Sequence, residues 1–223
     1  MILPVGLEPP PFFSIVMPTF NRRTLITKAI ASVFSQSFKE WELLMVDDGS
    51  TDGTFDSISK TILGDARLHY HYATNRGLPL ARNIGLMMAR GRYITFLDSD
   101  DQYLREHLAI RAEYLKQNPD VELLHGGVEV IGNDMVADKH DPSKLIPISE
   151  CVVGGTFVIR RDLVERLQGF RDIAYGDDAD FFERAEQSGA SIHKIAAPTY
   201  RYYRTEEDSL TAIAEREGLK VLQ

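Results

Sequence analysis

The chain has 223 residues, of which 43% are hydrophobic and 26% charged, and its formal net charge is −8. This length and composition predict one ordinary globular domain, which buries about 70% or more of the surface of its unfolded chain. The negative charge argues against a nucleic-acid partner, because general nucleic-acid binders present a basic face. The single cysteine, Cys151, excludes an intramolecular disulfide and a multi-cysteine zinc site, and it suits a reducing cytoplasm.

The N-terminal segment lacks the features of a secretion signal. Residues 1–13 contain no Lys or Arg, and residues 9–11 are three consecutive prolines. Residues 1–12 are therefore predicted to form a flexible arm. No window approaches 18 uninterrupted apolar residues, so no transmembrane segment is expected. The predicted location is the cytoplasm, and peripheral association with the inner face of the cell membrane is left open.

Apolar strands alternate with amphipathic helices in the first half of the chain. Residues 13–17 form an apolar run that stops at Pro18, as a buried strand does, and Asn21 is expected to cap a helix with apolar positions from Leu25 to Phe34. The next predicted elements are a strand at 43–46, a helix at 54–62, a strand at 67–72, a helix opened by Pro79 and a strand at 93–97. This alternation predicts an α/β fold with a parallel sheet and helices on both faces.

The second half of the chain is more mixed. Its predicted elements are a helix at 104–117, strands at 121–125, 128–131 and 152–159, and helices at 162–168 and 178–188. The segment 132–150 is rich in Asp, Pro and Ser and is predicted to be a mobile loop. No linker-like stretch separates the two halves, so both are expected to share one sheet in a single domain.

Acidic residues follow two of the predicted strands. Asp47 and Asp48 end the second strand, and Asp98, Asp100 and Asp101 follow the strand at 93–97 within four residues. Ligands of open α/β sheets bind at the carboxyl ends of the strands. Crowded carboxylates repel one another unless a cation neutralises them, and a hard divalent ion such as Mg²⁺ or Mn²⁺ suits oxygen ligands. Such an ion could bridge a diphosphate.

These acidic segments also have interpretations other than a divalent-cation site. Asp101 can instead be a cap for the helix at 104–117. Residues 48–53 match the first positions of an EF-hand loop, but Ser59 stands where its twelfth position requires Glu. The chain contains neither a P-loop nor a G-x-G-x-x-G motif, so a bound nucleotide would be held by carboxylates, loop amides and a metal.

Six segments, taken in order, resemble the nucleotide-sugar glycosyltransferases of family 2. They are SIVMPTFNR (14–22), ELLMVDDGSTDGT (42–54), NRGLPLARNIGL (75–86), GRYITFLDSDD (91–101), GGTFVIRRD (154–162) and GFRDIAYGDDADFFERA (169–185). The resemblance implies the GT-A fold, with a single Rossmann-like, mostly parallel sheet that is mixed at one edge. It also implies a catalytic domain over 13–223, with a nucleotide-sugar half at about 13–101 and an acceptor half at about 102–223.

The resemblance assigns roles to individual positions. Asp48 is similar to the carboxylate that accepts a hydrogen bond from the nucleotide base. Asp98 and Asp100 match the Asp-x-Asp motif of the metal site, in which Asp100 would bind the metal directly and Asp98 would contact the ribose or a metal-bound water. Asp178 would be the catalytic base, which takes a proton from the acceptor hydroxyl. The other residues that the resemblance places at the nucleotide sugar are Pro18, Phe20, Asn21, Asn75, Arg76, Arg82 and Ser99.

Two positions depart from the family pattern. The pair Asp177-Asp178 stands for the usual Glu-Asp, which keeps the charge. Glu206 stands where relatives often have a histidine that ligates the metal or contacts the diphosphate. The Glu206 carboxylate could replace that histidine as a ligand of a hard cation. Alternatively, the Glu206 side chain is exposed to solvent. Asp178 alternatively has no catalytic role and is an acidic residue in the first turn of the helix at 178–188, where the helix dipole favours negative charge.

The resemblance implies a metal-dependent, inverting glycosyltransferase with Mn²⁺ or Mg²⁺ as cofactor. Its partners would be a nucleoside-diphosphate sugar, with a UDP-sugar favoured, and a glycan or lipid-linked acceptor; a homodimer is left open. Segment 132–150 and the tail after residue 205 are predicted to shape the acceptor site. The alternatives are a nucleotidyltransferase, which would be expected to have a glycine-rich N-terminal loop, and a non-catalytic sugar-nucleotide or glycan-binding module.

Overall fold

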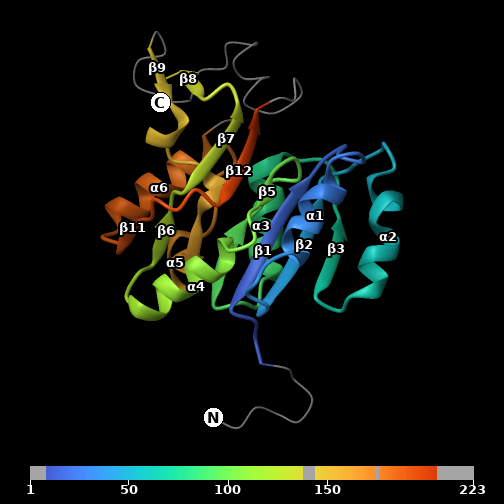
Figure 1. The fold of residues 1–223 in the computed structure, drawn as a ribbon, viewed down its shortest axis with the longest axis horizontal. Coiled ribbons are helices and arrows are strands. Elements are labelled where there is room, and N and C mark those ends of the chain that lie inside the picture. The colour runs from blue at the N-terminus through green and yellow to red at the C-terminus, as the bar shows by residue number, and fades with distance from the viewer. Residues whose placement is uncertain (1–8, 138–143, 174–175, 205–223) are drawn as a thin grey trace.

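A computed structural model describes residues 9–137, 144–173 and 176–204. Its centre is a seven-stranded sheet with the strand order β11-β6-β10-β4-β1-β2-β3 (Figure 1). The strands are β1 (Phe13–Thr19), β2 (Trp41–Asp47), β3 (Leu68–Tyr72), β4 (Tyr93–Phe96), β6 (Leu123–His125), β10 (Val158–Arg160) and β11 (Ile192–Lys194). Only β10 runs antiparallel to its neighbours, β4 and β6. The prediction of an α/β fold with a mostly parallel sheet is confirmed.

Helices cover both faces of this sheet because the side chains of its strands alternate between two apolar cores. Phe13, Ile15 and Met17 of β1 pack in one core, whereas Val16 packs in the other. The first core includes residues of α1 (Ile26–Phe34), α2 (Thr54–Gly64) and α4 (His107–Gln117). The second includes residues of α3 (Leu78–Met88), α5 (Arg161–Leu167) and α6 (Asp177–Gln187). This arrangement leaves the carboxyl ends of the parallel strands available at one edge of the sheet.

The close approach of α3 to β1 depends on a glycine. A Cβ atom at Gly85 would lie 2.3 Å from Cγ1 of Val16, so the helix can lie at this distance only without a side chain there. Pro79 lies in the first turn of α3, where its missing N–H costs no hydrogen bond. The segment before α3 lies beside the residue that follows β2, because the backbone N–H groups of Arg76 and Gly77 donate to the Asp48 carboxylate.

Two small sheets lie outside the seven-stranded one. The first is formed by β5 (Gln102–Tyr103), β12 (Tyr200–Arg204) and β7 (Val128–Gly132). The second pairs β8 (Met135–Ala137) with β9 (Leu145–Pro147) and is followed by the 3₁₀ turn η1 (Ile148–Glu150). The expectation that both halves of the chain share one sheet is confirmed, because β6, β10 and β11 of the second half join the seven-stranded sheet. Segment 132–150 is more than a loop, because its two ends pair as antiparallel strands.

The predicted strand at 152–159 divides into a turn and a short strand. Gly154–Thr156 forms the 3₁₀ turn η2, in which the N–H of Thr156 donates to the carbonyl of Val153. The strand β10 begins only at Val158. Two adjacent glycines favour this bend, because Gly lowers the stability of a strand interior.

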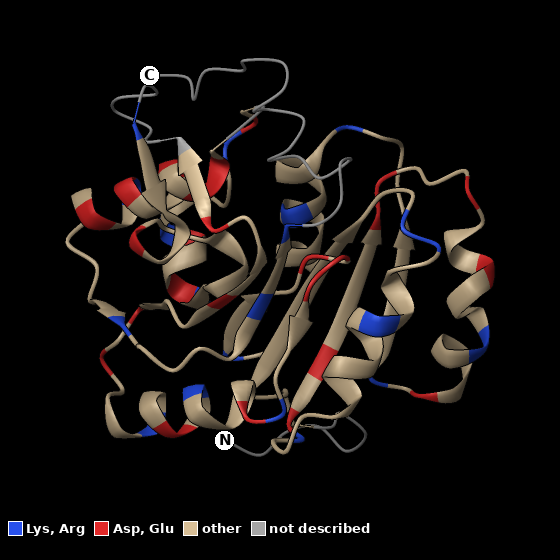
Figure 2. Ribbon diagram, turned by 45° about the horizontal axis from the view of Figure 1, so that its top comes forward, with Lys and Arg blue, Asp and Glu red and all other residues tan. Residues whose placement is uncertain are grey.

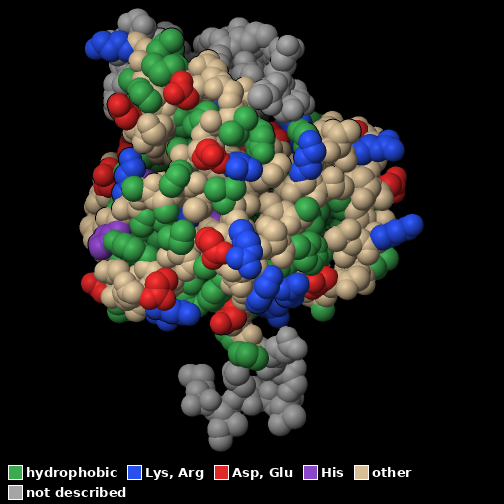
Figure 3. All heavy atoms as spheres, viewed as in Figure 1, with side chains coloured by type: hydrophobic (Ala, Val, Ile, Leu, Met, Phe, Trp, Pro, Cys, Tyr) green, Lys and Arg blue, Asp and Glu red, His purple; other side chains and the backbone are tan. Residues whose placement is uncertain are grey.

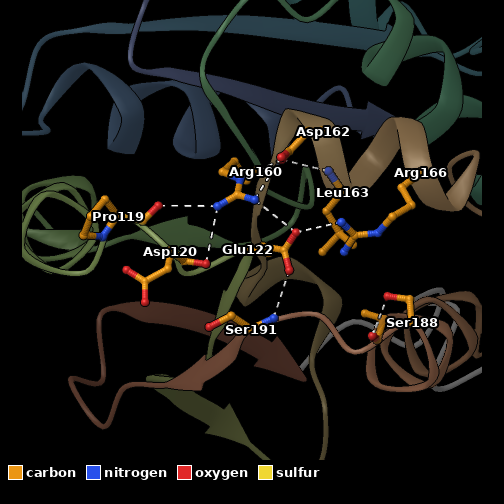
Figure 4. A network of polar contacts seen from close by, with 10 residues as sticks. Pro119, Asp120, Glu122, Arg160, Asp162, Leu163, Arg166, Ser188 and Ser191 are labelled. Atoms are coloured by element: carbon orange, nitrogen blue, oxygen red, sulfur yellow. Dashed lines mark hydrogen bonds and ion pairs between the residues drawn. The ribbon is translucent and has the colours of Figure 1, made fainter.

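The edge of the sheet opposite the carboxyl ends of the parallel strands is closed by a polar network around Glu122 (Figure 4). The Glu122 carboxylate accepts hydrogen bonds from Nη2 of Arg160 at 3.0 Å, Nη1 of Arg166 at 2.8 Å and the backbone N–H of Ser191 at 3.0 Å. The hydrogen bond from Arg166 is the largest cause of the lowered pKa of Glu122. These contacts join β6, β10, α5 and the start of β11.

Candidate active site

Acidic residues lie just beyond the carboxyl ends of β2 and β4, which belong to the same parallel part of the large sheet. Figure 2 shows acidic residues on connections near the centre of the molecule, at the ends of strands of the large sheet. The acid Asp48 follows β2 directly, and residues 98–101 follow β4. A third acidic segment, at the start of α6, is joined to residues 98–101 through Arg82, which contacts both Asp177 and Asp98.

The carboxylate of Asp48 holds the segment that leads into α3. Its Oδ1 accepts the backbone N–H of Arg76 and its Oδ2 the backbone N–H of Gly77, both at 2.8 Å. Gly77 has a φ of +94°, a conformation that favours glycine. Asn75 and Arg76 thereby lie beside Asp48. A cavity of about 350 Å³ opens next to this carboxylate, and its lining residues are Asp48, Ala73, Thr74, Arg76, Leu80, Asn83, Ile84 and Met87.

The segment after β1 is tied to the segment after β2. The backbone N–H of Asn21 donates to Oγ of Ser50 at 2.8 Å, and Oδ1 of Asn21 accepts the N–H of Thr51 at 2.9 Å. Asn21 has a φ of +52°, and α1 begins only at Ile26. The prediction that Asn21 caps this helix is therefore wrong, because its side chain is bound to the neighbouring connection. Pro18 and Phe20 precede this contact; Pro18 is buried and Phe20 is 44% exposed.

Residues 98–101 form a tight turn that carries the predicted metal ligands. The N–H of Asp101 donates to the carbonyl of Asp98 at 3.0 Å, and Ser99 is buried within the turn. The side chains of Asp98 and Asp100 are 31% and 16% exposed. Nη2 of Arg82 lies 3.7 Å from Oδ1 of Asp98, and Nε of Arg22 lies 3.6 Å from Oδ2 of Asp100. Burial raises the pKa of Asp98, although Arg82 opposes this shift.

Asp101 is a buried member of this turn and caps no helix. Its Oδ2 accepts a hydrogen bond from the hydroxyl of Tyr200 at 2.7 Å, and its Oδ1 accepts the N–H of Tyr203 at 2.8 Å. Helix α4 begins at His107, so the predicted start at residue 104 is also wrong. Burial is the largest cause of the pKa of Asp101 lying well above that of an ordinary aspartate. Its partners are in β12, about a hundred residues further along the chain.

Asp177 and Asp178, at the start of α6, have different surroundings. Oδ2 of Asp177 lies 2.6 Å from Nη1 of the buried Arg82. Asp178 accepts hydrogen bonds from the backbone N–H groups of Gly154 at 2.9 Å and Ala179 at 2.8 Å. Burial and the neighbouring Asp177 raise the pKa of Asp178, and Arg82 opposes the shift. Asp177 is thus paired with a cation, whereas Asp178 is held in place by amides.

The donor set of the turn fits a divalent cation shared with a diphosphate. Among residues 9–137, 144–173 and 176–204, no three His, Cys, Asp or Glu side chains group as a ready metal site. Mg²⁺ commonly binds one or two protein carboxylates and takes its other ligands from water and substrate phosphates. Asp98 and Asp100 supply carboxylates of that kind. Glu206, the third predicted ligand, lies outside the described residues.

The described residues offer no helix that is long and apolar enough to cross a membrane. The face of the molecule in Figure 3 carries acidic and basic side chains side by side, with no broad basic surface.

Comparisons with known proteins concern the fold and the family. In solved structures, the fold is similar to that of TarS from S. aureus in complex with UDP-GlcNAc, with a TM-score of 0.75, 23% identity, and coverage of 90% of this chain and 60% of that one. It is also similar to the mannosyltransferase PcManGT from Pyrobaculum calidifontis in complex with GDP-Man and Mn²⁺, with a TM-score of 0.73, 21% identity, and coverage of 98% and 65%. The class defined by this fold is the GT-A glycosyltransferases.

The sequence comparisons identify the family. Residues 14–167 match the model of glycosyl transferase family 2. An uncharacterized glycosyltransferase of Haemophilus influenzae is 36% identical over 82% of this chain and 75% of its own length. A GalNAc(5)-diNAcBac-PP-undecaprenol beta-1,3-glucosyltransferase of Campylobacter jejuni is 30% identical over 95% of this chain and 71% of its own length. The chain belongs to glycosyl transferase family 2.

Tyr200 and Gly154 are among the residues of this site that the sequence did not predict. Tyr200 contacts the turn at 98–101, and Gly154 donates to Asp178. The adjacent glycines at 154 and 155 were the sequence signal that could have indicated the role of Gly154, because paired glycines mark a place where backbones approach closely. No comparable local pattern marks Tyr200.

Proposed function

We propose that this chain transfers a sugar from a UDP-sugar to a hydroxyl of a lipid-linked glycan, with a divalent cation and with inversion at the anomeric carbon. The single observation that carries the proposal is the pairing of two acidic segments at one site. Asp98 and Asp100 lie on the turn after β4, and Asp178 lies at the start of α6, with Arg82 contacting acids of both segments. A group that binds the cation and a separate group that removes a proton are what such a transfer requires.

The donor half of the proposal rests on Asp48 and the residues around it. Pro18, Phe20, Asn21, Asn75 and Arg76 are proposed to enclose the nucleotide beside this carboxylate. The two hydrogen bonds from backbone N–H groups leave each oxygen of Asp48 a further lone pair, which can accept from an N–H of a base. The similarity to the solved structure of TarS in complex with UDP-GlcNAc supports a UDP-sugar.

Asp100 would bind the cation directly, and Asp98 would contact the ribose or a water bound to the ion. Ser99, which lies between these two residues in the sequence, is proposed to be at the nucleotide sugar. When bound, Mn²⁺ or Mg²⁺ supplies positive charge that stabilises the leaving diphosphate. The similarity to the mannosyltransferase PcManGT in complex with GDP-Man and Mn²⁺ supports a divalent ion. Glu206 remains a proposed ligand from its place in the sequence.

Asp178 is proposed to accept the proton of the acceptor hydroxyl. A sugar hydroxyl is a weak nucleophile, so a carboxylate near the bond being formed accelerates its attack by roughly 10²- to 10⁴-fold. The hydrogen bonds from Gly154 and Ala179 hold the Asp178 carboxylate in one orientation. Attack from the side opposite the leaving diphosphate would invert the anomeric centre.

The acceptor half of the proposal involves the second half of the chain. The name of the relative from Campylobacter jejuni specifies a glucosyl acceptor linked to undecaprenol by a diphosphate, which supports a lipid-linked acceptor. Such an acceptor would bring this chain to a membrane surface. Apolar side chains are visible at the end of the molecule formed by β8 and β9 (Figure 3), where Leu145 is 65% exposed. We propose that segment 132–150 contributes to acceptor binding.

The test is a panel of nucleotides and nucleotide sugars, each with and without Mn²⁺. A ligand at about a hundred times its dissociation constant stabilises a folded protein by about 2.7 kcal/mol. We expect UDP-sugars with Mn²⁺ to raise the melting temperature, and transfer to a lipid-linked acceptor to require the same ion. A nucleotide sugar that binds without any transfer would favour a binding module, and equal stabilisation with and without Mn²⁺ would contradict the proposed metal site.

A further inference from the structure

Tyr200, the first residue of β12, is fully buried and contacts both ends of the turn at 98–101. Its hydroxyl donates to Oδ2 of Asp101 at 2.7 Å and accepts the backbone N–H of Asp98 at 3.3 Å. The turn between these residues is closed by the bond from the N–H of Asp101 to the carbonyl of Asp98. One phenol group therefore holds both ends of the turn that presents Asp100.

The same turn is held a second time by β12. Oδ1 of Asp101 accepts the backbone N–H of Tyr203 at 2.8 Å, so both oxygens of this carboxylate are bound by β12. Asp101 is 1% exposed. A buried carboxylate that loses such partners has no water to replace them, so the turn cannot shift without a large cost. The position of Asp100 is thus coupled to the position of β12.

Tyr200 also lies against the turn that holds Asp178. A Cβ atom at Gly155 would lie 2.3 Å from the hydroxyl oxygen of Tyr200, so the phenol occupies the space that a side chain would need. The preceding residue, Gly154, donates its N–H to Oδ2 of Asp178 at 2.9 Å. The turn that carries Asp100 and the turn that orients Asp178 therefore both pack against the hydroxyl end of one buried side chain.

We propose that Tyr200 is a positioning residue that sets the distance between Asp100 and Asp178. It acts on Asp100 through Asp101 and on Asp178 through the Gly154–Gly155 turn. The inference rests on the proposed function, in which these two carboxylates bind the cation and accept the acceptor proton. Because a misplacement of about 1 Å can reduce a rate by about 100-fold, a contact that fixes this separation matters for the rate as well as for folding.

Tyr103 provides a matched control for the loss of a buried hydroxyl. It packs against Tyr200 with ring centroids 5.8 Å apart and is 3% exposed. Its hydroxyl donates to the carbonyl of Phe96 at 2.6 Å, within β4 and before the acidic turn. Removing either hydroxyl keeps the ring in the same core, so both changes affect stability in a similar way. Only the change at Tyr200 removes a contact with Asp98 and Asp101.

The experiment compares Tyr200→Phe with Tyr103→Phe in the full chain. Melting temperature, kcat and KM for a UDP-sugar, and the Mn²⁺ concentration that gives half-maximal transfer are measured for each. Tyr200→Phe should lower kcat by about tenfold or more and raise the Mn²⁺ requirement several-fold, with KM for the donor changed less. Tyr103→Phe should lower the melting temperature by a similar amount and leave kcat and the Mn²⁺ requirement within about twofold of the wild type.

Asp101→Asn is the second variant, and it has nearly the same shape as the wild-type side chain. Its amide cannot accept from both Tyr200 and Tyr203, so it should raise the Mn²⁺ requirement as Tyr200→Phe does. Equal effects of Tyr200→Phe and Tyr103→Phe on kcat and on the Mn²⁺ requirement overturn the inference while wild-type transfer upholds the proposed function. Failure of both Tyr200→Phe and Asp101→Asn to fold also overturns it, because the role is then structural. A wild-type chain without transfer activity overturns the proposed function, and the inference falls with it.

Discussion

Nη1 of Arg82 lies 2.6 Å from Oδ2 of Asp177, and the two side chains are only 4% and 8% exposed. The same guanidinium lies 3.7 Å from Oδ1 of Asp98. One buried cation thus faces carboxylates from two elements that are far apart in the chain, the turn after β4 and the start of α6. With Asp178 included, three carboxylates surround one arginine. The excess negative charge is what a divalent cation would offset.

Replacing Arg82 should destabilise the protein strongly. In Arg82→Met the carboxylates of Asp177 and Asp98 lose their cation in a buried site, and loss of one partner of a buried pair costs about 3–5 kcal/mol. Urea unfolding of the wild type and of Arg82→Met measures this difference in the free energy of unfolding. The control is Arg171→Met, because Arg171 pairs with Asp180 at 3.1 Å on the surface, with a side chain that is 65% exposed. That change should cost less than about 1 kcal/mol, and similar losses in both variants would contradict the importance of the buried pair.

Asp178→Asn should abolish most of the transfer activity and leave donor binding intact. The amide keeps the shape of the side chain but cannot accept a proton, so the rate of transfer should fall by roughly two to four orders of magnitude. Stabilisation by UDP-sugar and Mn²⁺ should stay close to that of the wild type. Asp180→Asn is the matched control on the same helical turn, since Asp180 binds Arg184 and Arg171. Unchanged transfer by Asp178→Asn would remove Asp178 from the role of base.

The pH dependence of transfer should reflect the raised pKa of Asp178. A base must be deprotonated to act, so kcat should fall as pH falls through this pKa. Burial and Asp177 raise that pKa, so the fall should begin above the pH at which an ordinary aspartate, with a pKa of about 3.9, takes up its proton. Asp177→Asn removes the neighbouring negative charge and should move the acid limb of the kcat profile to lower pH. An acid limb that stays in place or moves upward in Asp177→Asn would contradict the assignment.

Local patterns in the sequence predicted the central fold well, and the reasons are physical. Strands such as β1 and β2 are mostly apolar because both of their faces are buried, and each ends where an acidic or turn segment begins. The strands β8 and β9 were missed because each has only three residues and lies in a segment rich in turn-forming residues. Their pairing with each other, and not their composition, makes them strands.

The candidate site was predictable only in part for a related reason. Asp98, Asp100 and Asp178 occur at strand or helix ends, so their placement at one edge follows from the topology. Asp101 was open to interpretation as a helix cap because capping is a local property. Its actual partner, Tyr200, is 99 residues away, and a hydrogen bond over that separation leaves no pattern near either residue.

The space between η2 and α6 gives a last prediction, at a position where only glycine fits. A Cβ atom at Gly154 would lie 2.8 Å from Cβ of Asp178 and 3.1 Å from its Oδ2. Gly154→Ala should therefore displace the proposed base and lower kcat for transfer by about tenfold or more, because catalytic groups tolerate little misplacement. The thermal stabilisation by UDP-sugar and Mn²⁺ should change little, since Asp48 and Asp100 lie on other segments.

Gly64→Ala is the control for the added methyl group. Gly64 is the last residue of α2, and a Cβ atom there meets nothing within 4 Å. Alanine is favoured over glycine in helices by about 1 kcal/mol, so this variant should be as stable as the wild type or slightly more so, with unchanged transfer. If Gly154→Ala retains the wild-type kcat while its donor binding is intact, the orientation of Asp178 by the Gly154 amide has no part in the reaction. If both kcat and donor binding are lost, the glycine supports the fold of the whole site, and the specific coupling to Asp178 is contradicted.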